Sequence, residues 1–189
     1  MPSVPIWEQE RRLQEIERDS VTIEVLSSPL AYTFVDKRSP ELCRIMNDSL
    51  AEACRQAPDR LRAFAHLPFN DMDAALRELT RAVDELGFPG VLVSSNIAGR
   101  YPHTPEFWPF WEEVNRRKLP VFLHPAEPPQ NFDDERATLL EFPFDTTRSV
   151  MKLLYAGLFE RCPEVVLIVS HLGGTLPFLA RRIDQAYEM

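Results

Sequence analysis

Two histidines in this chain of 189 residues follow short apolar runs, and they are the first candidates for chemistry. His124 lies between the apolar run 120–123 and Pro125, and His171 comes shortly after the run 165–169. Neutral imidazole is the commonest nitrogen ligand of zinc and similar ions, and near neutral pH it can also transfer protons. The sequence therefore offers a metal ligand at His124 and either a second ligand or a general base at His171.

The segment that carries His124 has the pattern of a strand. Side chains alternate along a strand, so Phe122 and His124 share one face, and Val121 and Leu123 share the other. Apolar residues on both faces predict a strand buried on both sides, as in a parallel sheet covered by helices. Pro125 has no N–H for the ladder, so the strand ends just after His124. His124 is therefore expected at the carboxyl end of a strand, where α/β folds place ligands and catalytic groups.

The other two histidines have simpler interpretations. His66 also ends an apolar run, but a lone buried histidine is more often a hydrogen-bonded core residue than a ligand, and we expect that role for it. His103 is expected to be a solvated loop residue. Convergence on one rim of a parallel barrel favours a functional role for His124 and His171.

Several further polar residues are expected near the same rim. Glu127 and Asp145 are interpreted as solvated or capping residues. Arg148 is expected one turn into a helix, where it could bind an acidic substrate, although a surface arginine is the simpler interpretation. The pair Gly173 and Gly174 lies between a strand and a helix, so its amides could face an anion or allow a substrate to approach closely.

The remainder of the chain alternates between strand and helix patterns. Strands are predicted over residues 21–26, 62–68, 90–94, 120–124 and 165–169. Helices are predicted over residues 7–18, 39–53, 71–86, 104–117 and 145–162, and around 177–183. The polar, proline-bearing segment 127–134 is expected to be a loop over the strand ends. This alternation implies parallel strands with right-handed crossover helices, arranged as an open doubly wound sheet or as a barrel.

Composition excludes several classes of function. The net charge of −8 and the isoelectric point near 5.1 argue against nucleic-acid binding. No apolar run approaches the ~18 residues needed to cross a bilayer, and no signal peptide is visible. Cys43 and Cys54 are 11 residues apart on one predicted helix, which separates them by roughly 16 Å, so they cannot form a disulfide with each other. Reduced thiols and a cytoplasmic location are expected.

Three longer stretches resemble a known family. They are LGFPGVLVSSNIAGR, PEFWPFWEEVNRRKLPVFLHP and FPFDTTRSVMKLLYAGLFERCPEVVLIVSHLGGTLPFLARRID. They resemble the amidohydrolase-related family, whose best-described members are the aminocarboxymuconate-semialdehyde and hydroxybenzoate-type decarboxylases. The similarity runs from about Trp7 to Ile183. It implies a metal-dependent (β/α)8 barrel of the TIM type, and many such proteins are carboxy-lyases that act on aromatic or unsaturated carboxylic acids.

The resemblance also implies roles for individual residues. His124 matches the family's metal-binding histidine after the fifth barrel strand, and His171 matches the acid/base histidine after the sixth. The implied cofactor is a divalent metal, with zinc expected first and manganese as the alternative. The implied reaction is decarboxylation of a small carboxylic acid. A hydrolase of lactone or amide type on the same fold is the alternative, because both reactions share this ligand set.

The sequence also departs from the family pattern. Family members open with a His-x-His or Glu-x-His pair and end with a late aspartate, and neither is found here. A full barrel takes ~250 residues, roughly 31 per strand–helix unit, so 189 residues supply about six units. We therefore expect one partial barrel domain over residues 1–189, truncated at both ends, with about five parallel strands. Its open edges would be 21–26 and 165–169, and exposed edges invite pairing with another chain, so a homo-oligomer is plausible.

This departure leaves a third interpretation open. The chain alone is expected to bind metal poorly, because His124 is its single direct ligand. It could then be a catalytically incomplete fragment or remnant that contributes part of a barrel to a partner.

Overall fold

The computed structural model describes residues 8–28, 36–126 and 137–187. These residues form one sheet of five parallel strands in the order β1-β2-β3-β4-β5. The strands are β1 (Glu24–Leu26), β2 (Leu61–Ala65), β3 (Gly90–Ser94), β4 (Pro120–His124) and β5 (Val166–Val169). The expected α/β class with five parallel strands is confirmed. The start of the first predicted helix and the predicted loop 127–134 lie outside the described residues.

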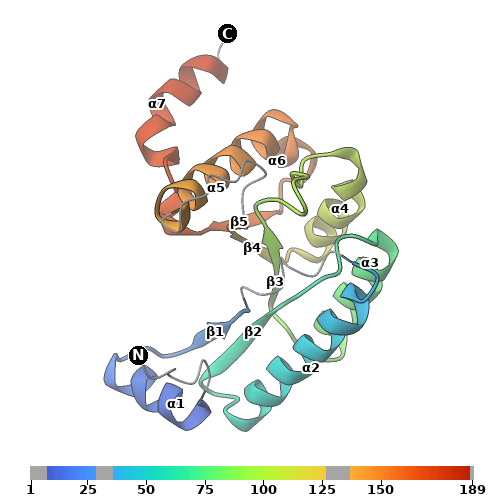
Figure 1. Ribbon diagram of the computed structural model, residues 1–189, viewed down its shortest axis with the longest axis vertical. Coiled ribbons are helices and arrows are strands. Elements are labelled where there is room, and N and C mark those ends of the chain that lie inside the picture. The colour runs from blue at the N-terminus through green and yellow to red at the C-terminus, as the bar shows by residue number, and fades with distance from the viewer. Residues whose placement is uncertain (1–7, 29–35, 127–136, 188–189) are drawn as a thin grey trace.

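Helices alternate with these strands, as predicted. They are α1 (Gln9–Arg18), α2 (Ser39–Gln56), α3 (Met72–Asp84), α4 (Trp108–Arg117), α5 (Ala137–Tyr155), α6 (Leu158–Arg161) and α7 (Leu176–Tyr187), with short 3-10 turns η2 (Pro105–Phe107) and η3 (His171–Gly173). Figure 1 shows α2, α3 and α4 along one side of the sheet and α7 extending away from it. No helix in the described ranges combines the length and the apolar character needed to cross a membrane.

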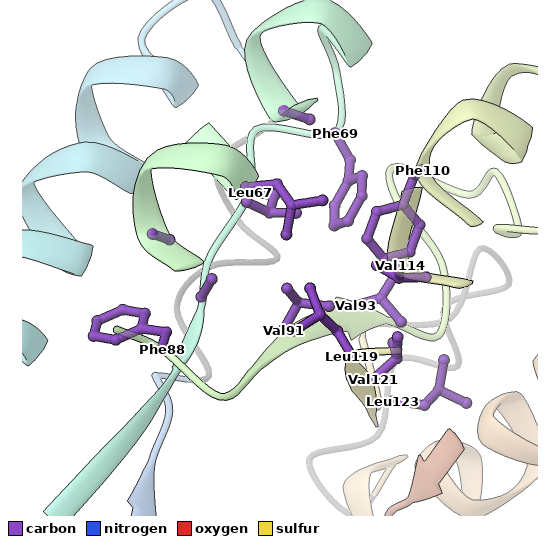
Figure 2. Close-up of a cluster of buried hydrophobic side chains, with 14 of the residues drawn as sticks. Leu67, Phe69, Phe88, Val91, Val93, Phe110, Val114, Leu119, Val121 and Leu123 are labelled. Atoms are coloured by element: carbon purple, nitrogen blue, oxygen red, sulfur yellow. The ribbon is translucent and has the colours of Figure 1, made fainter. Parts of the chain in front are cut away.

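The hydrophobic core lies between the sheet and the helices on its covered side. Figure 2 shows Val91 and Val93 of β3 and Val121 and Leu123 of β4 in the same cluster as Phe110 of α4. Aromatic side chains supply much of this core, because each can bury some 150–250 Å². The free energy of folding therefore comes mainly from this one side of the sheet.

β4 shows how one-sided the burial is. Val121 and Leu123 are fully buried, whereas Phe122 and His124 are only half-buried. The predicted division of these side chains between two faces is confirmed, but the expectation that both faces are buried is wrong. Helices cover one face only within the described residues.

Most helix boundaries follow local sequence signals. Asp71 is the N-cap of α3, and its carboxyl group accepts a hydrogen bond from the Ala74 N–H, as its residue type predicts. The start of α2 is displaced by one residue, because Ser39 is already helical and Arg38 is the N-cap. All three cysteines are free, as expected.

The predicted start of α5 near Asp145 is wrong. The helix begins at Ala137 and contains Pro143. Proline removes one backbone donor and usually ends a helix, so the sequence pattern favoured a later start. In the structure the Pro143 carbonyl still accepts a hydrogen bond, from the Thr147 hydroxyl, and the helix continues through this position.

The uncovered face of the sheet carries several apolar side chains, together with Arg62 beside Val25 and His124 at the end of β4. By register it carries Val25 of β1, Phe122 of β4, and Val166 and Ile168 of β5, which we call the open face. Val25, Val166 and Ile168 are 42%, 59% and 41% exposed. Phe122 and Ile168 are cross-strand neighbours, so the apolar surface is contiguous over β4 and β5, and such surface marks a region of association. β1 and β5 are the two edge strands of the described sheet, as predicted.

We predict that the 189-residue chain associates through this open face. Ile168→Lys places a charge there and should weaken self-association at least about tenfold, which is ~1.4 kcal/mol, as measured by sedimentation equilibrium. Ile45→Lys is the matched control, since Ile45 is an exposed isoleucine on α2, away from this face. Equal association constants for the two variants would contradict the prediction.

Candidate active site at the carboxyl ends of the strands

His124 is the last residue of β4, and its ring has a defined protonation pattern. Its Nδ1 lies 2.7 Å from the Pro125 carbonyl oxygen, so Nδ1 carries the proton and donates it. Nε2 is then the basic nitrogen, which is the form of imidazole that binds a metal ion. Burial lowers the pKa of His124, the bond to Pro125 opposes that effect, and the nearby charge of His171 lowers the pKa further.

His171 follows β5 and lies at the same end of the sheet. Ser170 fixes the end of β5 against β4, because both its N–H (3.3 Å) and its hydroxyl (2.5 Å) donate to the Leu123 carbonyl. The next residue is His171, whose side chain is exposed. The two imidazoles therefore come from neighbouring parallel strands at one rim, which is the arrangement that the sequence predicted.

The backbone after β5 is unusual. His171 and Leu172 have φ values of 50° and 55°, in the left-handed region that L-residues seldom adopt. For a bulky residue such as Leu172 this conformation costs roughly 1–2 kcal/mol. Strain of this kind gathers at functional sites, so the turn supports a functional role for His171.

Gly174 allows this turn to pack against α5. A Cβ atom at Gly174 would lie 2.3 Å from the Pro143 carbonyl oxygen and 2.7 Å from the Thr147 Oγ1. Thr147 also accepts a hydrogen bond from the Thr175 N–H at 2.9 Å, which joins the two segments. Gly174 therefore permits close approach of helix α5. Close approach of a substrate to Gly173 and Gly174 stays a prediction.

A buried carboxyl group lies beside the rim. Asp145 is fully buried, and its Oδ2 accepts hydrogen bonds from Ser95 Oγ (2.6 Å) and Asn96 Nδ2 (3.0 Å). Its Oδ1 accepts a hydrogen bond from the Tyr101 hydroxyl at 2.6 Å. The interpretation of Asp145 as a solvated or capping residue is therefore wrong. It joins the end of β3, the following loop and α5.

Cationic side chains surround the outer part of this cluster. Arg148 Nη1 lies 3.7 Å from Asp145 Oδ1, and the arginine side chain is about half exposed. Arg148 lies in the middle of α5 rather than in its first turn. The Lys152 Nζ lies 5.0 Å from the centre of the Tyr101 ring. Burial first, and the bond to Asp145 second, raise the pKa of Tyr101 to about 12, so its phenol stays protonated.

Three further candidates from the sequence are His66, His103 and Glu127. His66 is fully buried, and its Nε2 accepts a hydrogen bond from the Ser28 N–H at 3.0 Å. Its backbone N–H and carbonyl both bond to the Asn47 side chain. These contacts support the structural role that we expected. His103 lies in a loop but is only partly exposed, and Glu127 lies outside the described residues.

Within the described residues, no three His, Cys, Asp or Glu side chains converge as a metal site would require. His124 fits a metal by its tautomer and its lowered pKa, but it is one ligand. The assignment of His124 to metal, His171 to proton transfer and Arg148 to substrate stays a prediction.

Ser95 and Asn96 were not predicted from the sequence, and neither was the burial of Asp145, although signals for all three exist. The polar pair Ser95 and Asn96 directly follows a fully apolar strand, at the end where α/β folds place their sites. Asp145 precedes Ser149 and Leu153 at four-residue steps along one helix face, which is the spacing of a buried stripe.

Comparison with known proteins places these residues in context. A family model described as amidohydrolase matches residues 17–188. The γ-resorcylate decarboxylase of Rhizobium sp. strain MTP-10005 is 38% identical over 192 residues, which cover 93% of this chain and 59% of that protein. The 2-amino-3-carboxymuconate-6-semialdehyde decarboxylase of Dictyostelium discoideum is 30% identical, over 96% of this chain and 52% of that protein. The chain thus spans little more than half the length of these relatives.

A solved structure is similar in fold as well. It is a dihydroxybenzoic acid decarboxylase from Polaromonas sp. JS666, with bound manganese and the inhibitor 2-nitroresorcinol. It superposes with a TM-score of 0.80 at 32% identity, over 93% of this chain and 58% of that one.

We predict that Gly174→Ala destabilises the protein far more than Gly173→Ala does. Both glycines have a positive φ, but a Cβ at Gly173 would have no neighbour closer than 3.6 Å. Because the added methyl at Gly174 would collide with the Pro143 carbonyl, we expect a difference in unfolding free energy of at least ~2 kcal/mol. Chemical denaturation measures it, and equal losses would contradict the packing described for this turn.

We also predict that His66 makes the fold acid-sensitive. Burial, with a smaller contribution from the charge of His124, lowers the pKa of His66 from 6.5 to about 4. The unfolded chain therefore takes up the proton first, so stability is complete above pH 6.5 and falls as the pH drops from 6.5 toward 4. Between pH 7 and pH 5 this group removes about 2 kcal/mol.

The variant His66→Gln tests this, since glutamine can accept the Ser28 bond and does not titrate. Between pH 7 and pH 5, the unfolding free energy of this variant should fall by about 2 kcal/mol less than that of the wild type. His171→Gln serves as the control, because the His171 side chain is exposed. An unchanged pH dependence in His66→Gln would show that His66 is not responsible.

Proposed function

The chain belongs to the amidohydrolase family, and from that premise we propose that it supplies three functional residues, His124, His171 and Arg148, of a metal-dependent decarboxylase of aromatic carboxylic acids. The observation that carries this proposal is the pair His124, at the end of β4, and His171, shortly after the neighbouring strand β5, with His124 in the tautomer that leaves Nε2 basic. Relatives at 30–38% identity are decarboxylases, which supports the reaction.

His124 would hold the metal through Nε2. Manganese is our first choice, because the Polaromonas decarboxylase contains it, and zinc is the alternative from the sequence. A bound divalent ion polarises substrate oxygens and lowers the pKa of coordinated water. The lowered pKa of His124 favours binding, since a neutral imidazole is required.

His171 would deliver the proton. In decarboxylation a proton adds to the ring carbon that bears the carboxylate, the carbon–carbon bond breaks, and carbon dioxide leaves with the ring restored. The proton donor must therefore stand beside the metal ligand and be open to the substrate. His171 meets both conditions, because it is exposed and follows the strand next to β4.

Arg148 would attract the carboxylate of the substrate. Its guanidinium group is about half exposed and is held near the rim by Asp145. A planar guanidinium matches a carboxylate through two parallel hydrogen bonds. This charge fits a small carboxylic acid, and the relatives support an aromatic one.

Substitution of the two histidines in the full gene product tests the proposal. With Mn²⁺ and 2,6-dihydroxybenzoate, His171→Asn should lower kcat by roughly 10²–10⁴ while Mn²⁺ binding stays within about twofold. His124→Ala should lose both turnover and Mn²⁺ binding. His103→Asn, at a loop histidine outside the proposed machinery, should match the wild type.

Release of carbon dioxide and binding of Mn²⁺ are measured separately in this experiment. Normal turnover by His171→Asn would contradict the proposed role of His171. Hydrolysis of a lactone or amide without release of carbon dioxide from any aromatic acid would overturn the decarboxylase assignment.

A further inference from the structure

We propose that Ser95 and Asp145 form a clamp that positions His124 for metal binding. This inference rests on the proposed function of His124 as a metal ligand. Neither Ser95 nor Asp145 would touch the metal or the substrate. They are positioning residues that act through the backbone of residues 124–126.

Ser95 holds the chain on both sides of Pro125. Its N–H donates to the His124 carbonyl at 2.7 Å, and its Oγ accepts from the Ala126 N–H at 2.9 Å. Pro125 has no N–H, so the strand ladder cannot continue through it. The Ser95 side chain takes over as the acceptor at the point where regular pairing stops.

Asp145 fixes the direction of that hydroxyl group. The Ser95 Oγ donates its hydrogen to Asp145 Oδ2 at 2.6 Å, which turns an oxygen lone pair toward the Ala126 N–H. A carboxylate accepts hydrogen bonds and donates none, so the hydroxyl can point in one direction only. Both side chains are fully buried, and no water can replace a lost bond without reaching the interior.

The clamped segment is also the one that orients His124. The imidazole Nδ1 of His124 donates to the Pro125 carbonyl, which lies between the two atoms that Ser95 holds. Displacement of this carbonyl would release the ring and allow the other tautomer. Groups that orient a ligating histidine in this way typically change metal affinity 10–100-fold when they are removed.

The residues around Asp145 make the clamp rigid. Asn96 Nδ2 donates to the same carboxyl oxygen as Ser95, and the Tyr101 hydroxyl donates to the other. Asp145 itself lies on α5, so the position of His124 on β4 is coupled to a helix 21 residues further along the chain. The carboxyl group of Asp145 is thus buried with three hydrogen-bond donors, which compensate for its removal from water.

Ser95→Ala in the full gene product tests the clamp, with Ser149→Ala as its matched control. Ser149 is fully buried on α5, and its Oγ has no hydrogen-bond partner in the described part of the chain, so the same atom is removed outside the clamp. Electron paramagnetic resonance titration measures the dissociation constant for Mn²⁺. We expect it to rise 10–100-fold in Ser95→Ala and to stay within about twofold in Ser149→Ala.

Hydrogen exchange of the Ala126 amide gives a second readout that needs no metal. Exchange should accelerate at least about tenfold in Ser95→Ala, and less in Asp145→Asn, which keeps one oxygen as an acceptor. If Ser95→Ala does not fold, Asp145→Asn carries the test with both readouts. Unchanged exchange at Ala126, or faster exchange with unchanged Mn²⁺ affinity, would overturn the clamp.

The two proposals fail in different ways. A wild-type protein that binds no Mn²⁺ would overturn the function proposed for His124. In the same sample, exchange at Ala126 still decides whether Ser95 holds this segment.

Discussion

The carboxyl end of β4 is held from both of its neighbours, and the geometry of the site depends on that hold. On one side the Ser170 hydroxyl and N–H bind the Leu123 carbonyl, and on the other the Ser95 N–H binds the His124 carbonyl. Two serines therefore continue the strand pairing at the point where Pro125 would end it. His124 projects from the segment that they fix, and His171 follows one of them directly.

This hold is effective because the covered side of the sheet is rigid. Val121 and Leu123 of β4 pack into the core with no exposed surface, so the strand cannot slide against its helices without opening a cavity. The opposite side, which carries Phe122 and His124, is open within the described residues. The candidate metal ligand His124 therefore lies on the side of the sheet that is not used for packing.

Much of this arrangement could be predicted from the sequence, because its causes are local. The alternation at 120–124 gives a strand, Pro125 ends it, and a parallel sheet brings strand-end histidines to one rim. The role of Asp71 as a helix cap is also local, because its carboxyl group bonds to the Ala74 N–H three residues away. By contrast, the burial of Asp145 depends on Ser95 and Tyr101, which are 50 and 44 residues away. Pro143 inside α5 likewise misled the prediction, since local rules place a proline at the end of a helix.

Anomalous diffraction from crystals of the full gene product grown with Mn²⁺ tests the central claim most directly. We expect a single strong anomalous peak at bonding distance from Nε2 of His124, with Nδ1 still donating to the Pro125 carbonyl. The His171 ring, from the turn after β5, should face the ion. A manganese peak at any site away from His124 would contradict the account, as would a His124 ring turned so that Nε2 contacts protein instead of metal.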